Sequence, residues 1–134
     1  MTKLVDIEGI GAAYAEKLSA AGVSTVEKLL EKGASPAGRK ELEAASGLSG
    51  KLILRWCNMA DLFRIKGVGE EYADLLEAAG VDTVPELAQR NAANLHAKME
   101  EVNGEKKLVR ALPSEKQVAD WVAQAKDLPR VMTY

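Results

Sequence analysis

The chain repeats one stretch of its own sequence, and this duplication constrains the fold more than any other feature. Residues 7–30 match residues 65–88 at 13 of 24 positions, 58 residues further along the chain. Two unrelated segments do not share so many residues in register, so the chain contains two copies of one structural unit. The repeat predicts a first unit over residues 1–62 and a second over residues 63–134.

Each copy opens with a hydrophobic residue, a Gly-x-Gly turn and a run of helix-forming residues. The first copy reads Ile-Glu-Gly-Ile-Gly-Ala-Ala-Tyr-Ala from position 7, and the second reads Ile-Lys-Gly-Val-Gly-Glu-Glu-Tyr-Ala from position 65. Glycine permits the positive φ that such a tight turn requires. Gly22 and Gly80 follow at the spacing of glycines that end a helix. The pattern predicts a helix from Ala12 to about Ala21 and its counterpart from Glu70 to about Ala79.

The composition favours helices over a sheet. Aromatic residues make up only 4% of the chain, whereas strands favour aromatic and β-branched residues. Apolar residues at 47% and charged residues at 28% are typical of a globular domain. We therefore predict an all-α protein.

Capping residues predict where further helices begin and end. Ser24 with Glu27 forms a capping-box pattern, as does Ser114 with Gln117, and Ser35 precedes Pro36 at the start of another helix. A helix that starts at Asn91 or Asn94 is expected to end at Asn103-Gly104. Trp56 and Trp121 occupy equivalent places in the last helix of each unit, and we interpret both as core residues.

The turn and the helix after it form a candidate anion site in each copy. The first amides of a helix have no partner within the helix, and the positive end of its dipole lies behind them. A phosphate oxygen could contact the amides of Gly9, Gly11 and Ala12 in the first copy. The corresponding amides in the second copy are those of Gly67, Gly69 and Glu70.

The residues from Ile7 to Leu18 and from Ile65 to Leu76 resemble helix-hairpin-helix motifs, which are non-sequence-specific DNA-binding elements of repair and recombination proteins. The longer pattern is similar to the N-terminal helical domain of RadA/Rad51-type recombinases. The whole chain resembles an uncharacterised bacterial family of small tandem helix-hairpin-helix proteins, catalogued as a domain of unknown function. The resemblance implies a tandem duplicated, SAM-like (RadA N-terminal-like) fold and brings no established activity.

The resemblance also implies particular site residues. Phosphate contacts would come from the two turns and from basic residues near them, namely Gly9, Ile10, Gly11, Ala12, Lys17, Lys66, Gly67, Val68 and Gly69. A monovalent cation would be held by backbone carbonyls in each copy, those of Val5, Ile7 and Ile10 and those of Phe63, Ile65 and Val68. We expect no other cofactor.

The charges weigh against nucleic acid as the partner. The net charge is −2, and acids follow the second turn at Glu70 and Glu71, where they would repel a phosphate. Two hypotheses therefore stay open: weak, sequence-independent nucleic-acid binding through the turn amides, and a protein-interaction or adaptor module whose turns are structural only. A third places a small ligand or anion in the groove between the two units.

No pattern of catalytic residues is present, and we expect a non-enzymatic protein. Cys57 is the only cysteine and lies beside Trp56 in an apolar pattern, which indicates a core residue. His96 is the only histidine, and the acids show no metal-binding spacing. No apolar run approaches the ~18 residues of a membrane span, and the start of the chain lacks a signal-peptide layout. We therefore expect a cytoplasmic protein with no membrane partner.

Overall fold

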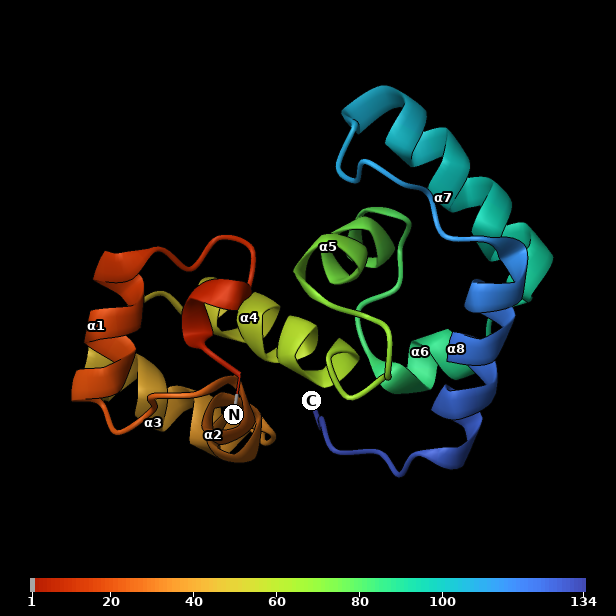
Figure 1. Ribbon diagram of the computed structural model, residues 1–134. Helices are drawn as coiled ribbons and strands as arrows, with labels where there is room; N and C mark the ends of the chain where they lie inside the picture. The colour runs from red at the N-terminus through yellow and green to blue at the C-terminus, as the bar shows by residue number, and fades with distance from the viewer. Residues whose placement is uncertain (1) are drawn as a thin grey trace. The chain divides into compact units, whose positions relative to one another are not determined.

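The computed structural model describes residues 2–134, and these residues form an all-helical structure without a regular strand (Figure 1). Eight α-helices follow a single 3-10 turn. In chain order the elements are η1 (Leu4–Asp6), α1 (Ala12–Ala20), α2 (Val26–Gly33), α3 (Pro36–Ser46), α4 (Gly50–Leu62), α5 (Glu70–Ala78), α6 (Val84–Ala88), α7 (Ala92–Lys106) and α8 (Glu115–Asp127). The prediction of an all-α protein is confirmed.

The chain packs as two compact units. The first contains the chain up to Asp61 together with Val131–Tyr134, and the second contains Leu62–Arg130. The division from the sequence places Leu62 in the first unit and residues 131–134 in the second, so the two divisions differ at both places. Residues 131–134 join the first unit because the Thr133 amide donates to the carbonyl of Ala34 at 2.8 Å, while Met132 is buried.

The two units use the same aromatic pair in their cores. Tyr14 packs on Trp56 with ring centroids 5.1 Å apart and an interplanar angle of 53°. Tyr72 packs on Trp121 at 5.2 Å and 50°. Both indoles are almost fully buried, so the interpretation of the two tryptophans as core residues is confirmed. Aromatic pairs of this kind add roughly 0.5–1.5 kcal/mol beyond the area that they bury.

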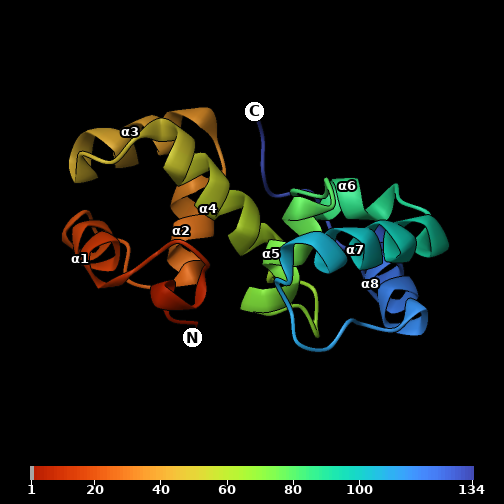
Figure 2. The ribbon, with the colours of Figure 1, turned by 90° about the horizontal axis from the view of Figure 1, so that it is seen from above.

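The helix packing in the second unit explains where its tryptophan lies. Helices α6 and α7 both pack against α8, which presents Val118, Trp121, Val122 and Ala125 to them as a buried stripe (Figure 2). In the first unit, α3 packs against both α1 and α2. The amphipathic patterns of the sequence therefore account for the layers of each unit.

Most of the predicted helix starts are confirmed, and one is wrong. Ser35 accepts a hydrogen bond from the amide of Gly38 at 3.1 Å, and Ser114 forms a complete capping box with Gln117. The predicted Ser24 cap is wrong, because the hydroxyl of Thr25 accepts the amide of Lys28 instead. The carboxylate of Glu27 accepts the amide of Thr2 at 2.8 Å.

The predicted end of the long helix in the second unit is also wrong. Helix α7 continues through Asn103-Gly104 to Lys106, and Lys107 ends it with a φ of 51°. The side chain of Asn103 explains the difference. Its Oδ1 accepts the amide of Val109 at 3.0 Å and its Nδ2 donates to the carbonyl of Val109 at 3.3 Å, so it anchors the segment beyond the helix.

Gly33, the last residue of α2, lies directly against Cys57 of α4. A Cβ at this position would overlap the Sγ of Cys57, which is fully buried in α4 and lies 3.8 Å from the carbonyl oxygen of Leu29. Gly104 is the opposite case, because a Cβ there meets nothing within 4 Å. Substituting alanine at Gly33 and at Gly104 therefore compares a tightly packed helical position with an open one.

We predict that Gly33→Ala lowers the free energy of unfolding by about 1–3 kcal/mol through steric overlap. Gly104→Ala should raise it by about 0.5–1 kcal/mol, because alanine is the better helix former. Urea unfolding of both variants measures the difference. Adding Cys57→Ala to Gly33→Ala should recover part of the loss. Equal effects of the two glycine substitutions would contradict this packing.

Candidate functional site

The two Gly-x-Gly turns have the same backbone. The amide of Ile10 donates to the carbonyl of Ile7 at 3.1 Å, and the amide of Val68 donates to the carbonyl of Ile65 at 3.1 Å. Gly9 has a φ of 95° and Gly67 a φ of 96°. A positive φ at the third position of a hydrogen-bonded four-residue turn is typical of a type II turn. The repeated sequence thus produces a repeated backbone geometry.

A tryptophan lies beside each turn, and at the second turn its closeness is a further reason for glycine. A Cβ on Gly9 would lie 3.5 Å from Nε1 of Trp56, and a Cβ on Gly67 would lie 3.1 Å from Nε1 of Trp121. By contrast, a Cβ on the second glycine of either turn would meet nothing within 4 Å. Gly11 and Gly69 are the N-cap residues of α1 and α5, where no side chain caps the first helical amides.

The structure separates one predicted basic residue from the first turn. Lys17 lies in the last turn of α1, about 9 Å along the helix axis from Gly11. The residue that lies beside the turn is Arg55 of α4, because its Nη1 would be 3.0 Å from a Cβ on Gly9. The sequence alone does not single out Arg55 as a residue near the turn. Arg55 directly precedes the core residue Trp56, but this position becomes informative only once α4 is seen to lie against the turn.

The second turn is clamped by a side chain from α8. The amide of Lys66 donates to Oε1 of Gln124 at 2.9 Å, and Nε2 of Gln124 donates to the carbonyl of Lys66 at 3.1 Å. Nε2 also donates to the carboxylate of Asp120 at 2.9 Å. When α4 and α8 are aligned on their tryptophans, the position of Gln124 is taken by Met59, which is buried and cannot form such a clamp.

The charges beside the two turns also differ. Glu70 and Glu71 lie in the first turn of α5, whereas Ala12 and Ala13 lie in the first turn of α1. Aligned on the tryptophans, Asp120 of the second unit takes the position of Arg55 in the first. Within the turns themselves the signs are opposite, with Glu8 in the first and Lys66 in the second. The acids at the start of α5 oppose an anion there, whereas the alanines at the start of α1 do not.

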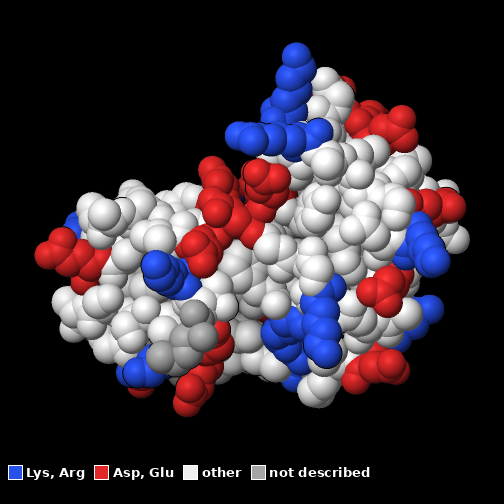
Figure 3. All heavy atoms as spheres, in the orientation of Figure 1, with Lys and Arg blue, Asp and Glu red and all other residues white. Residues whose placement is uncertain are grey.

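The basic side chains do not merge into one patch on the face shown in Figure 3. Lys and Arg form separate small groups with acidic groups between them, and the group at the top lies over the carboxyl end of α7. A continuous basic stripe is the usual footprint of nucleic-acid binding. The visible face therefore offers short basic clusters only.

Two large side chains near the first turn in the sequence are exposed. Val5, before the turn, is 44% exposed, and Tyr14, after it, is 37% exposed. The corresponding residues of the second unit, Phe63 and Tyr72, are only half-exposed. The hydroxyl of Tyr72 donates to the carbonyl of Ala111 at 3.2 Å. Tyr14 forms no such bond within the described part of the chain.

The carbonyls suggested for a monovalent cation are partly engaged. Those of Ile7 and Ile65 accept the hydrogen bonds that close the turns. The other four, those of Val5, Ile10, Phe63 and Val68, lie in the same two turn regions. Among residues 2–134, no three His, Cys, Asp or Glu side chains gather as metal ligands would. In the same range, no helix has the length and apolar character needed to cross a membrane.

Cys57 and His96 have structural positions. Burial raises the pKa of the Cys57 thiol to about 12, although nearby Arg39 lowers it, so the group stays protonated at neutral pH. Nε2 of His96 lies 2.9 Å from the carbonyl oxygen of Pro113 and so contacts the segment between α7 and α8.

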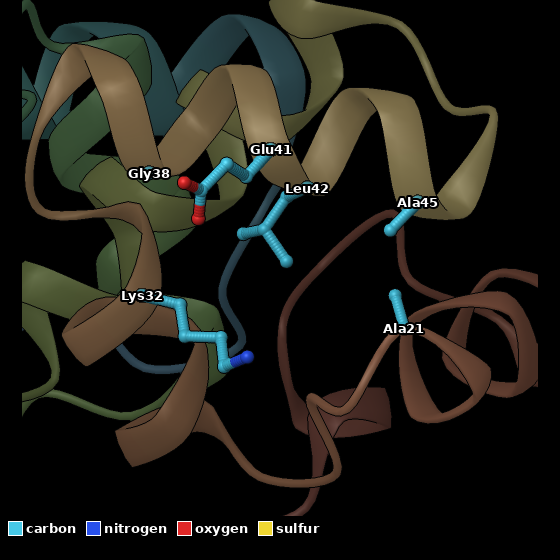
Figure 4. A pocket seen from close by; sticks show the side chains of 6 residues that line it. All are labelled: Ala21, Lys32, Gly38, Glu41, Leu42 and Ala45. Carbon is cyan, nitrogen blue, oxygen red and sulfur yellow. The ribbon is translucent and has the colours of Figure 1, made fainter.

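A small hollow of about 280 Å³ lies elsewhere in the first unit (Figure 4). Leu42, Ala45 and Ala21 form its apolar wall, while Lys32 and Glu41 contribute polar groups at its rim. Both charged residues are exposed, and none of the predicted site residues lines the hollow. It is therefore separate from the turn.

The comparisons with known proteins give a family for the chain. The profile of the family described as "Domain of unknown function (DUF4332)" matches residues 8–128. The chain belongs to this family. The match includes both turns and both tryptophans. No curated protein and no solved structure matches the chain.

We predict that Gln124→Ala destabilises the second unit by about 1–2 kcal/mol, because it removes the hydrogen bonds that clamp the turn. Gln89→Ala is a matched control, since Gln89 is exposed and its side chain forms no hydrogen bond within the described residues. Its effect should stay within about 0.5 kcal/mol. Urea unfolding provides the comparison, and equal effects of the two substitutions would show that the clamp contributes nothing.

Proposed function

We propose that this chain is a non-catalytic protein-interaction module built from two helix-hairpin-helix units, and that the surface beside the first turn contacts the partner. The observation that supports this proposal is the exposure of Val5 and Tyr14 on either side of an unclamped turn. Contiguous exposed apolar patches are typical of protein contact sites, and the proposal takes these two side chains as parts of one such patch.

The likeness of the two units supports the helix-hairpin-helix interpretation. The turn glycines differ by 1° in φ, from 95° to 96°, and the tyrosine–tryptophan pairs have similar distances and angles. The element before the first turn is only the three-residue η1, whereas α4 precedes the second. The comparison with RadA/Rad51-type recombinases rests on the sequence pattern alone.

The charges favour a protein over nucleic acid as the partner. Glu70 and Glu71 stand at the start of α5, and Lys17 lies at the far end of α1 from its turn. Few positive charges lie at the turns: Arg55 stands beside the first, and Lys66 lies within the second. Nucleic-acid binders that ignore sequence depend on many such charges.

The non-catalytic part of the proposal rests on the chemistry of the available groups. The thiol of Cys57 is buried with a pKa of about 12, and the ring of His96 is engaged with a backbone carbonyl. Neither group is placed to act as a nucleophile or a general base.

We predict that the full chain captures a protein partner from its native extract, and that the capture survives nuclease treatment. Val5→Asp should reduce the captured partner about tenfold or more, because it puts a charge into an apolar contact. Ala97→Asp, an exposed position on α7, is the control and should leave capture unchanged. Capture that nuclease abolishes, or that Val5→Asp does not affect, would contradict the proposal.

Weak, sequence-independent nucleic-acid binding is the second candidate. It is favoured by the first turn of α1, which carries Ala12 and Ala13, has no side-chain cap, and lies near Arg55. Such a helix start can accept a phosphate oxygen. The second turn would contribute little because of its acids.

If this second candidate holds, Arg55→Glu should weaken binding of a fluorescent DNA duplex more than Lys17→Glu does. The reason is that Arg55, and not Lys17, stands beside the turn. A salt titration gives the number of phosphate contacts from the slope of log affinity against log salt. Absence of binding at about 50 mM salt, where such contacts are strong, would exclude this candidate.

A further inference from the structure

Residues 131–134 complete the first unit although they follow the second unit in the chain. The chain passes from the first unit to the second after Asp61 and returns after Arg130. We call the returning residues, Val131–Tyr134, the clasp segment. The first unit therefore contains a site for a short segment that reaches it from another part of the protein.

The backbone of the clasp segment is bound through both polar groups of one residue. The amide of Thr133 donates to the carbonyl of Ala34 at 2.8 Å, and its hydroxyl donates to the same oxygen at 3.2 Å. The carbonyl of Thr133 accepts Nη2 of Arg39 at 2.8 Å. Ala34 is the C-cap residue of α2, where carbonyls lack partners within the helix. The end of α2 and Arg39 thus recognise main-chain groups of the segment.

Two side chains flank this backbone contact. Met132 is buried, with 1% of its surface exposed. The ring of Tyr134 lies 5.5 Å from the guanidinium carbon of Arg39, and its hydroxyl donates to Oδ1 of Asn58 at 2.8 Å. Paired main-chain groups beside a buried side chain are typical of sites that bind extended segments. We call Ala34, Arg39 and Asn58, with the buried position of Met132, the clasp site.

The connection before the clasp segment is short and irregular. Helix α8 ends at Asp127, and residues 128–130 have no regular structure. Pro129 and Arg130 are exposed, and the carbonyl of Pro129 accepts Nη2 of Arg64 at 2.6 Å within the second unit. The clasp segment therefore starts from a fixed point in the second unit. Short hinge segments of this kind favour the exchange of an element between two copies of a chain.

We propose that the clasp site of one copy accepts the clasp segment of a second copy, so that the protein forms a dimer by reciprocal exchange of residues 131–134. Each copy has one segment and one site, so two exchanges fill both sites and close the assembly with two-fold symmetry. The contacts of the clasp are the same within one copy and between two copies. This inference is independent of the surface beside the first turn and goes beyond the proposed function.

The concentration of the protein and the length of the connection decide between the two forms. The clasp contacts are present in both forms, so their strength cancels. Within one copy, a short connection holds the segment near its site at an effective concentration on the order of 1 mM. The monomer should therefore dominate at about 10 µM, and a shorter connection should favour the dimer at that concentration.

The test compares the full chain with a variant that lacks Pro129 and Arg130. The deletion keeps the clasp segment and the clasp site and removes up to about 7 Å of reach. Sedimentation velocity at about 10 µM should show a monomer for the full chain and mainly a dimer for the deletion variant. Adding Met132→Asp to the deletion variant should abolish the dimer, because it places a charge in a buried site. Ala123→Asp, at an exposed position of α8, is the matched control and should leave the dimer intact.

A second variant keeps the buried methionine, in case Met132→Asp prevents folding. Thr133→Pro removes the amide that donates to Ala34. In the deletion variant it should weaken the dimer about tenfold or more, because each dimer loses two hydrogen bonds.

Several outcomes would overturn the inference. A deletion variant that stays monomeric up to about 1 mM, the concentration at which exchange should compete, is the first. A dimer that survives both Met132→Asp and Thr133→Pro is the second. A peptide of residues 128–134 that binds full-length Met132→Asp, while the deletion variant stays monomeric, would assign the clasp site to another protein's segment and not to a second copy.

Val5→Asp separates this inference from the proposed function. It should leave the dimer of the deletion variant unchanged, because Val5 is not part of the clasp site. A dimer that Val5→Asp abolishes would place the contact between copies beside the first turn and would overturn the exchange. The capture of a protein partner by the full chain bears on the proposed function alone.

Discussion

The packing of a tryptophan against the turn glycine is the contact on which each unit depends. Trp56 and Trp121 are buried beside Gly9 and Gly67, where a positive φ strains any larger residue and where, at Gly67, a Cβ would also lie tightly against the indole. The tyrosine of the following helix packs on the same indole with its ring tilted. Turn, helix and core are thereby held together by one cluster, whose geometry is nearly the same in the two units.

Divergence between the units has affected the surroundings of this cluster and not the cluster itself. The second turn is closed by Gln124, flanked by acids and accompanied by a segment that engages Tyr72. The first turn keeps the same backbone without these additions, and its apolar flank is exposed. In the second unit Tyr72 is bonded to another segment of the same unit, whereas the corresponding Tyr14 of the first unit is exposed. That difference, and not a set of reactive groups, is the basis of the proposed function.

The sequence predicted those features that depend on local chemistry. The all-α class, the turn glycines, the capping box at Ser114 and the two core tryptophans follow from periodicity and composition. The wrong or missing predictions involve residues distant in sequence. Glu27 binds Thr2, Asn103 binds Val109, and Arg55 reaches Gly9 from another helix. Side chains that can bond either locally or across the fold are ambiguous until the tertiary packing is known, which is why the sequence points to Lys17 and not to Arg55.

Amide hydrogen exchange of the intact chain tests the central claim, that the two turns share a backbone but only the second is closed. The amide of Lys66 is bonded to Gln124, whereas the amide of Glu8 at the matching position has no partner within the described residues. We predict that Lys66 is protected while Glu8 exchanges near the rate of an unstructured peptide. Equal protection of the two amides would contradict the account.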